Sequence, residues 1–308
     1  GNLRAAPVIA ADFKLRDSHF RQVPLAGAGN LRLAWPRITG ADLWLSLGKN
    51  RLEVRGALGQ PADQLQFDLR APQLADLGGA GSVHGQFRLA GSLEALRLSG
   101  ELQSPRLGWP GLFSVEQLLL ATDVSTGKRA ASATAPLALE LSLARLDLPG
   151  QVGLAEKLAL KVSGNRQQHL LNFSTRLFGD DQLQLRASGG VSSQPELVWQ
   201  GAIDTLQLHS RNSARNVRLQ SPASLRLSQT AWRLADLHLA GNPLDWQARL
   251  GAEVRNERLN LTLAVDGSRF GRLAAQLAAR MDGAWALDRR QPWQGEVSLQ
   301  AEDLAWLG

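Results

Sequence analysis

The 308-residue chain has 34 basic and 28 acidic residues, a formal net charge of +6, and 44% hydrophobic residues. It contains no cysteine, which excludes disulfide frameworks, thiolate metal sites and cysteine nucleophiles. No run in it approaches the ~18 consecutive apolar residues that a membrane-spanning helix needs.

Apolar and polar residues alternate along most of the chain. Because successive side chains of a strand point to opposite faces, this period of two predicts strands that are apolar on one side only. The clearest case is the segment from Leu244 to Val254. In chain order, the other alternating segments are 31–35, 43–47, 65–69, 87–89, 96–98, 137–143, 158–162, 173–177, 206–208, 225–227, 237–239, 259–265 and 297–301.

Turn-forming residues separate these segments about every ten positions, which is typical of an all-β protein. The predicted turns are Gly27–Gly29, Gly78–Gly81, Asn165–Arg166, Asp180–Asp181, Gly189–Gly190, Gly241–Pro243 and Asn256–Glu257. Helical signals are few. Residues 73–77 could form one helical turn, residues 112–120 are ambiguous, and residues 273–281 are predicted to be a strand.

The pattern predicts roughly 20 strands or more, whereas an open twisted sheet rarely exceeds ~10 without curling or splitting. Two architectures remain: ordinary sandwiches or barrels, and a sheet curled lengthwise into a trough. We predict the second, an elongated, mostly antiparallel, curled all-β sheet with an apolar concave interior. Residues 1–308 are expected to form one continuous region, with a soft boundary near 125–135 left open.

The sequence offers little site chemistry. The five histidines lack the short spacing of metal ligands, and adjacent acids such as Asp180 and Asp181 are typical turn formers. No nucleophile elbow or phosphate-binding loop occurs. We therefore predict no catalytic residue, no metal, no cofactor and no enzyme activity. Most arginines recur singly on the polar strand faces, which indicates a solvated face rather than nucleic-acid binding. A second interpretation, contact with lipid phosphates, stays open.

The tryptophans allow two interpretations. Trp44, Trp199 and Trp246 lie within or beside predicted strands, and Trp109 lies near a turn. They either pack against neighbours or anchor a rim, where an indole ring sits between apolar material and water.

The segment Asp266–Leu277, with Gly-Ser-Arg-Phe-Gly leading into Ala-Ala-Gln-Leu, resembles the TamB family. The turn at Gln291–Trp293, the strand at Gly295–Leu299 and the end at Asp303–Leu307 extend the resemblance, which covers about 246–308. The remaining chain resembles the wider AsmA-like group in style only. The resemblance implies an internal fragment of a periplasmic β-groove protein, anchored to the inner membrane through a segment outside this chain.

The resemblance also implies phospholipid movement between the membranes and a TamA-like outer-membrane barrel as partner, contacted through regions outside this chain. Three functions stay open at this stage: a groove for phospholipid acyl chains, a scaffold for unfolded outer-membrane β-barrel proteins or autotransporters, and a plain β-sandwich or solenoid surface protein. We favour the first. The residues predicted to line the groove are Leu137, Leu139, Leu141, Leu158, Leu160, Leu183, Leu185, Leu206, Leu208, Leu237, Leu239, Trp246, Leu250, Leu259, Leu261, Leu263, Leu277, Val297 and Leu299.

Overall fold

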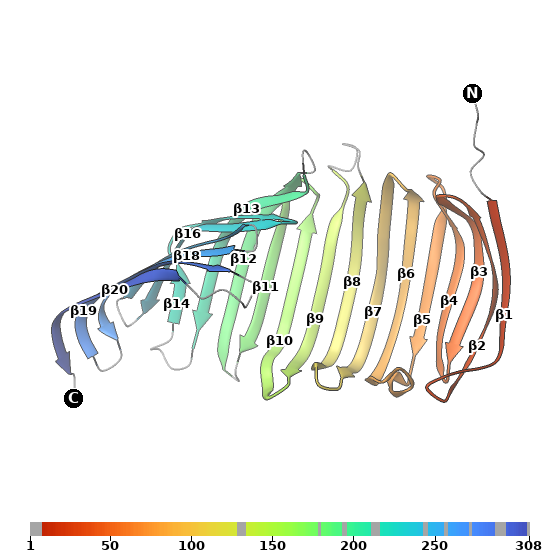
Figure 1. Ribbon diagram of the computed structural model, residues 1–308, viewed down its shortest axis with the longest axis horizontal. Coiled ribbons are helices and arrows are strands. Elements are labelled where there is room, and N and C mark those ends of the chain that lie inside the picture. The colour runs from red at the N-terminus through yellow and green to blue at the C-terminus, as the bar shows by residue number, and fades with distance from the viewer. Residues whose placement is uncertain are drawn as a thin grey trace, which may run out of the picture. The chain divides into compact units, whose positions relative to one another are not determined.

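The computed structural model describes the backbone of residues 8–127, 134–177, 180–192, 196–210, 216–242, 246–255, 258–270, 273–286 and 294–306. Side chains are described for the same residues as far as 266, apart from 242 and 258. Nearly all of these residues lie in strands, and the strand pairings are antiparallel, so the predicted all-β antiparallel class is confirmed (Figure 1). The chain divides into two compact units, Gly1–Asn165 and Arg166–Gly308. The expectation of one continuous region stays a prediction.

The first unit is an up-and-down sheet in which each strand pairs with the next along the chain. Its elements are β1 (Val8–Phe20), β2 (Val23–Ala34), β3 (Arg37–Leu47), β4 (Asn50–Leu58), β5 (Gln64–Ala71), η1 (Leu74–Leu77), β6 (Ala80–Ser92), β7 (Ala95–Trp109), β8 (Phe113–Gly127), β9 (Leu137–Leu148) and β10 (Gln151–Gly164).

The second unit continues the same pattern. Its strands are β11 (His169–Leu177), β12 (Asp181–Ser192), β13 (Val198–His209), β14 (Asn216–Leu219), β15 (Ala223–Ser228), β16 (Ala231–Asn242), β17 (Trp246–Arg255), β18 (Arg258–Phe270), β19 (Leu273–Ala286) and β20 (Gln294–Trp306). Both β14 and β15 lie between β13 and β16, so they occupy one strand position that is interrupted at residues 220–222.

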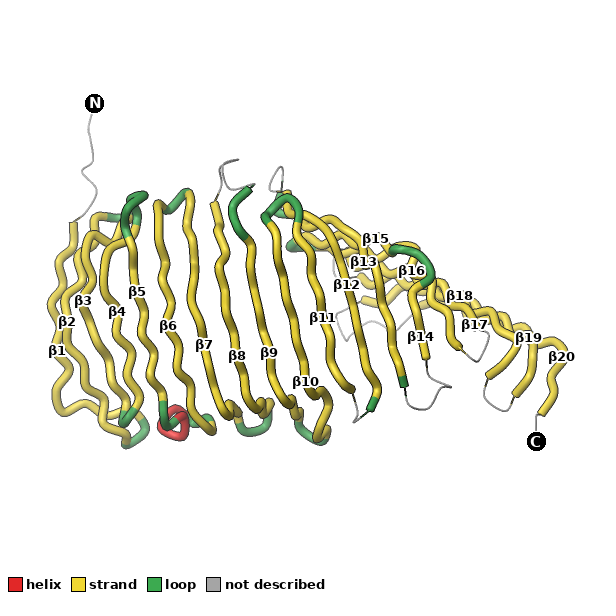
Figure 2. Tube along the Cα trace, turned by 180° about the vertical axis from the view of Figure 1, so that it is seen from behind, coloured by secondary structure: helices red, strands yellow, loops and turns green. Residues whose placement is uncertain are grey.

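The first unit rolls around a small core. Ala41, Leu58 and Leu65 are buried together, and the cluster contacts residues from Leu31 of β2 to Leu96 of β7. In a flat sheet these two strands would be ~24 Å apart, because neighbouring strands are spaced by ~4.8 Å. The strands must therefore curl around the cluster, and Figures 1 and 2 show β1 to β3 crowding together where β5 to β10 are spread out.

Several sequence expectations are settled here. The helical turn predicted at 73–77 is confirmed as η1 (red in Figure 2), and residues 112–120 belong to the turn before β8 and to β8 itself. Residues 273–281 form part of β19, as predicted.

Two predicted turns are wrong, because Gly27–Gly29 lies inside β2 and Gly189–Gly190 inside β12. Glycine is present there because a neighbour comes close. A Cβ on Gly27 would lie 2.6 Å from Leu45 Cδ2, and one on Gly189 would lie 2.5 Å from the Trp199 ring.

The segment carrying η1 is tied to the sheet by one buried amide. Asn50 is 5% exposed, donates a hydrogen bond to the Gln73 carbonyl at 2.8 Å, and accepts one from the Gln73 N–H at 3.0 Å. Leu74, the first residue of η1, is also 5% exposed. The two hydrogen bonds of Asn50 therefore pin the η1 corner to the start of β4.

We expect Asn50→Ala to lower the free energy of unfolding by about 1–3 kcal/mol, since both Gln73 backbone groups lose their partner. Urea unfolding measures the loss, and amide exchange should accelerate most in residues 72–78. Gln66→Ala, on the exposed face of β5, is the control and should change stability by less than ~0.5 kcal/mol. Equal losses in the two variants would contradict the pinning role.

Candidate functional site

The candidate site is the apolar face of the sheet. In an antiparallel pair, directly opposite residues lie on the same face, so the register assigns residues to faces across strands. In the first unit, Leu120 pairs with Leu141 and Leu141 with Leu160. In the second, Leu237 pairs with Leu250 and Leu250 with Leu263. Each chain of pairs forms an apolar row that runs across the strands.

The predicted lining residues fall into such rows wherever their side chains are described. Leu183 and Leu185 of β12 pair with Leu208 and Leu206 of β13, and Leu261 of β18 pairs with Ala252 of β17. The remaining described members are Leu137, Leu139, Leu158, Leu239, Trp246 and Leu259, in β9, β10, β16, β17 and β18.

Three predicted lining residues are described by their backbone alone. Leu277 pairs with Gly267, Val297 with Met281 and Leu299 with Ala279. Their registers extend the rows of β18 into β19 and β20. The role of all these residues as the lining of a groove stays a prediction.

The prediction missed the same face in the first part of the chain. Val54 pairs with Phe67, and Phe67 with Phe87, which continues the apolar face across β4, β5 and β6. The sequence signal was present, because segments 65–69 and 87–89 alternate as clearly as the later ones. These residues are half-buried.

Apart from the small core of the first unit, against which Val54 and Phe67 pack, no second layer of the described residues covers this face. The chain exposes 19865 Å², whereas two compact globules, each of half its mass, would together expose only ~15,000 Å². Among the described side chains, no large one is fully buried. The leucines of the apolar rows are therefore covered mainly by one another and keep part of their surface accessible.

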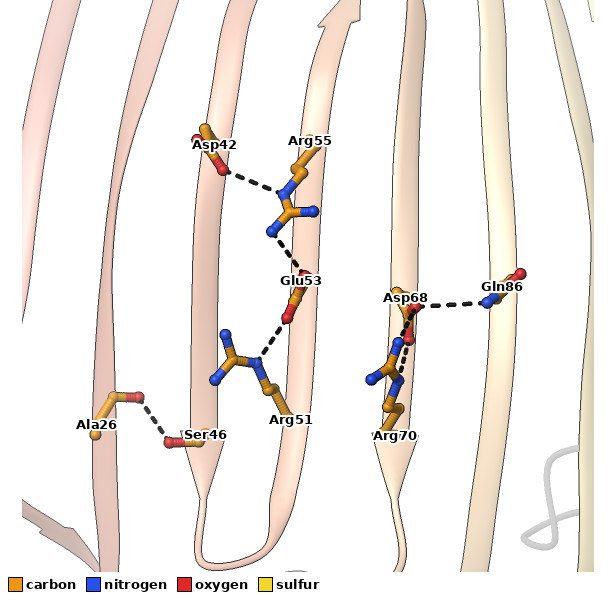
Figure 3. Close-up of polar contacts among 9 residues, drawn as sticks. All are labelled: Ala26, Asp42, Ser46, Arg51, Glu53, Arg55, Asp68, Arg70 and Gln86. Atoms are coloured by element: carbon orange, nitrogen blue, oxygen red, sulfur yellow. Dashed lines mark hydrogen bonds and ion pairs between the residues drawn. The ribbon is translucent and has the colours of Figure 1, made fainter.

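The opposite face is polar and ordered by ion pairs, which Figure 3 shows on β3 to β6. Arg55 bridges Asp42 and Glu53, at 3.4 and 3.0 Å, and Arg70 pairs with Asp68 at 2.9 Å. Such exposed pairs contribute little to stability, but they give this face a solvated surface.

The polar face also has open hollows, where small residues lie among long charged side chains. One of about 610 Å³ lies on β16 to β18, around Gly251 and between Arg233, Arg249 and Glu253.

Within the described part of the chain, no cluster of three or more His, Asp or Glu side chains could hold a metal ion. The described residues also contain no helix long and apolar enough to cross a membrane.

Electrostatic shifts follow the same ion pairs. Arg97 binds Asp123 through two hydrogen bonds of 2.7 and 2.5 Å, and this contact lowers the pKa of the Asp123 carboxyl below its usual value. At the β9–β10 turn, the N–H of Gly153 donates to Asp147 at 2.5 Å and Arg145 donates at 2.9 Å, and together they lower the pKa of Asp147.

These features define a class: open antiparallel sheets with one uncovered apolar face and one ion-paired polar face. The family described as "TamB, N-terminal domain" matches residues 17–235, which is more than half of the chain. The chain belongs to this family of envelope proteins of the translocation and assembly module. No solved structure matches the chain.

The family model matches residues 17–235, whose alternating, glycine-rich strands resemble the wider AsmA-like group only in general pattern. The segment that carried the resemblance, Asp266–Leu277, lies beyond its end. The family prediction is confirmed, and the match that confirms it lies outside the short motif.

The pH dependence of the Arg97–Asp123 pair follows from the direction of the Asp123 shift. Because the folded-state pKa is lowered, the pair stabilises the protein fully above pH ~4 and loses this contribution as the pH falls through the folded value. A double-mutant cycle of Asp123→Asn and Arg97→Gln, measured by urea unfolding, should show favourable coupling at pH 7 that declines as the pH is lowered and Asp123 becomes protonated. Coupling that persists in acid would contradict this account.

Proposed function

We propose that the uncovered apolar faces carry the acyl chains of phospholipids between the inner and outer membranes, as part of a TamB-like system for outer-membrane homeostasis. The observation that supports this is the set of apolar rows without a covering layer. In this proposal the chain works in the periplasm and is attached to the inner membrane, and meets a TamA-like barrel, through regions outside this chain.

An acyl chain matches this surface in chemistry. It has no polar groups to satisfy, so a continuous dry strip binds it without specific hydrogen bonds. Each buried CH₂ contributes about 0.8 kcal/mol, so a tail of 16 carbons gains on the order of 10 kcal/mol before ordering costs. The headgroup would stay at the strand ends, in water and near arginines.

A second candidate function is a scaffold for unfolded outer-membrane β-barrel proteins. Among the described residues, β1 pairs on one side only, with β2, so its other edge offers unpaired N–H and C=O groups. An incoming strand could add there. The acyl-chain function is preferred because the apolar rows recur in both units and run across many strands, whereas strand addition would use only an edge strand such as β1 or β20.

The acyl-chain proposal predicts that Leu185→Asp and Leu261→Asp reduce the phospholipid that co-purifies with the chain several-fold. A carboxylate in an apolar row breaks its dry surface, because it keeps its water. Quantitative mass spectrometry of extracted lipid measures the effect. In a second test, each variant is expressed in cells that lack the native protein. Neither variant should restore outer-membrane integrity.

The matched controls carry the same new charge on the polar face, one residue away. Gln184→Asp and Asn260→Asp lie at exposed positions of β12 and β18 and should leave the lipid content unchanged. Circular dichroism should show folded strands in all four variants. Full lipid content and full function in the two leucine variants would overturn the proposal.

The scaffold function is tested from the β1 edge. A photo-crosslinker at Asp12, an exposed position of β1, should capture unfolded barrel proteins if strands add there. A crosslinker at Leu141, in an apolar row, should capture acyl chains if the preferred function is right. Protein adducts at both positions, without lipid adducts, would favour the scaffold.

A further inference from the structure

We propose that one edge of the first unit binds the surface of a lipid bilayer through the tips of its turns. In an up-and-down sheet, every second turn lies at the same edge. The turns after β1, β3, β5, β7 and β9 therefore lie together at one end of the strands, the lower end in Figure 1. We call it the odd-turn edge.

Large apolar side chains project from four of these five turns. Their exposed fractions run from 36% at Leu77 to 80% at Val152. Single exposed apolar residues are ordinary, as are Trp35 and Leu93 in turns at the opposite edge, but a row of them over four of five turns marks an interaction surface. The set consists of Phe20, Leu77, Trp109, Leu112, Leu148 and Val152.

Contacts join these tips from turn to turn. A Cβ on Gly78 would lie 3.0 Å from the guanidinium of Arg21, so the β1–β2 turn reaches the corner after η1. A Cβ on Gly79 would lie 3.1 Å from the ring of Trp109, so the β7–β8 turn reaches the same corner. These contacts bring the tips of the β1–β2, β5–β6 and β7–β8 turns close together, and the β9–β10 turn follows at the same end of the strands.

The turns do not need these apolar residues. Pro110 and Gly111 make the β7–β8 turn, with Gly111 at φ +76° and the Leu112 N–H donating to the Trp109 carbonyl at 3.0 Å. Proline and glycine alone specify this turn. The β9–β10 turn repeats the device with Gly150 at φ +75°. Polar residues could flank both turns without strain, so neither the turn nor, for Leu112, a close neighbour accounts for the exposed apolar side chain, whereas the Trp109 ring also lies against Gly79.

The charges of the edge suit an anionic bilayer. Arg21 and Lys49 are exposed at the tips of the β1–β2 and β3–β4 turns. Asp76, the carboxylate nearest to Lys49, accepts hydrogen bonds from the Lys49 backbone and from Asn50, and so helps to build the corner. Indole and aliphatic tips beside lysine and arginine form the composition that partitions into the headgroup region of a membrane.

A bilayer also fits the spacing of the tips. Turns at the same edge recur every two strands, or about 10 Å. A surface of uniform chemistry meets such a row at every position, whereas a protein would need a matching pocket for each tip. The odd-turn edge is distinct from the apolar rows, so this proposal does not depend on the cargo that they carry.

The test is flotation of the 308-residue chain with vesicles of phosphatidylethanolamine and phosphatidylglycerol, compared with phosphatidylcholine alone. The chain should float, and more strongly with the anionic vesicles. Leu112→Glu combined with Val152→Glu should weaken binding about tenfold or more, since two inserted side chains are lost. Lys49→Gln should weaken binding to the anionic vesicles about fivefold and leave phosphatidylcholine binding unchanged.

Leu93→Glu is the matched control, because Leu93 is 42% exposed in a turn at the opposite edge. It should bind vesicles like the unchanged chain, as should the apolar-row variant Leu185→Asp. In a second readout, acyl-brominated lipids should quench Trp109, so Trp109→Phe should remove part of the quenching and Trp35→Phe should not.

Failure of the chain to float would overturn the proposal, as would an equal loss of binding in Leu93→Glu and the double variant. Loss of binding in Leu185→Asp alone would assign the vesicle contact to the apolar rows instead. Retained lipid in the odd-turn edge variants, together with lost flotation, would support separate roles for the edge and the rows.

Discussion

The structure depends on keeping apolar side chains on one face of each strand, because the described part of the chain has no second layer to bury a side chain that points the wrong way. A strand with strict alternation meets this constraint automatically. Several strands here do not alternate strictly. Val115 and Leu118 of β8, Ala155 and Leu158 of β10, and Leu234 and Leu237 of β16 are each three residues apart. A regular strand would place the members of each pair on opposite faces.

The backbone corrects these phase slips. Gln117, Lys157 and Asp236 lie inside the three slips and have φ values of +52°, +50° and +59°. Left-handed residues of this kind turn the strand locally and return the next apolar residue to the apolar face. In β16 the correction is a bulge, since the register to β17 shifts between Leu234 and Leu237. The strain of a non-glycine residue at positive φ is outweighed by keeping the rest of the strand in phase.

The sequence predicted strands better than it predicted their irregularities. Alternation identifies the strands directly, since it follows from the pleat. Glycine was less informative, because it allows both a turn and a close neighbour. Gly189 is predicted to lie in a turn but lies in β12. Its close neighbour is the ring of Trp199, ten positions along the chain. The bulge at Asp236 was also out of reach, since only the pairing with β17 reveals it.

The candidate site shows the same limit. The rows are predictable as a chemical type from segments such as 259–265, and segments 65–69 and 87–89 carry the same signal for β5 and β6. The odd-turn edge was not predictable, because it needs the parity of the strand order. Once consecutive strands are known to pair, the end of the sheet at which each turn lies follows. Trp109 then lies at the odd-turn edge, where the proposed membrane contact would use it as a rim anchor.

A single-layer sheet has a further physical consequence. Each strand contacts mainly its two neighbours, so stability accumulates from local interfaces rather than from one central core. Part of the apolar face stays in water, and this exposed surface adds nothing to the free energy of unfolding until a ligand covers it. Any ligand that binds the folded face but not the unfolded chain adds RT ln(1 + [L]/Kd) to the stability of the strands beneath it. Occupancy and folding of such a sheet are therefore coupled.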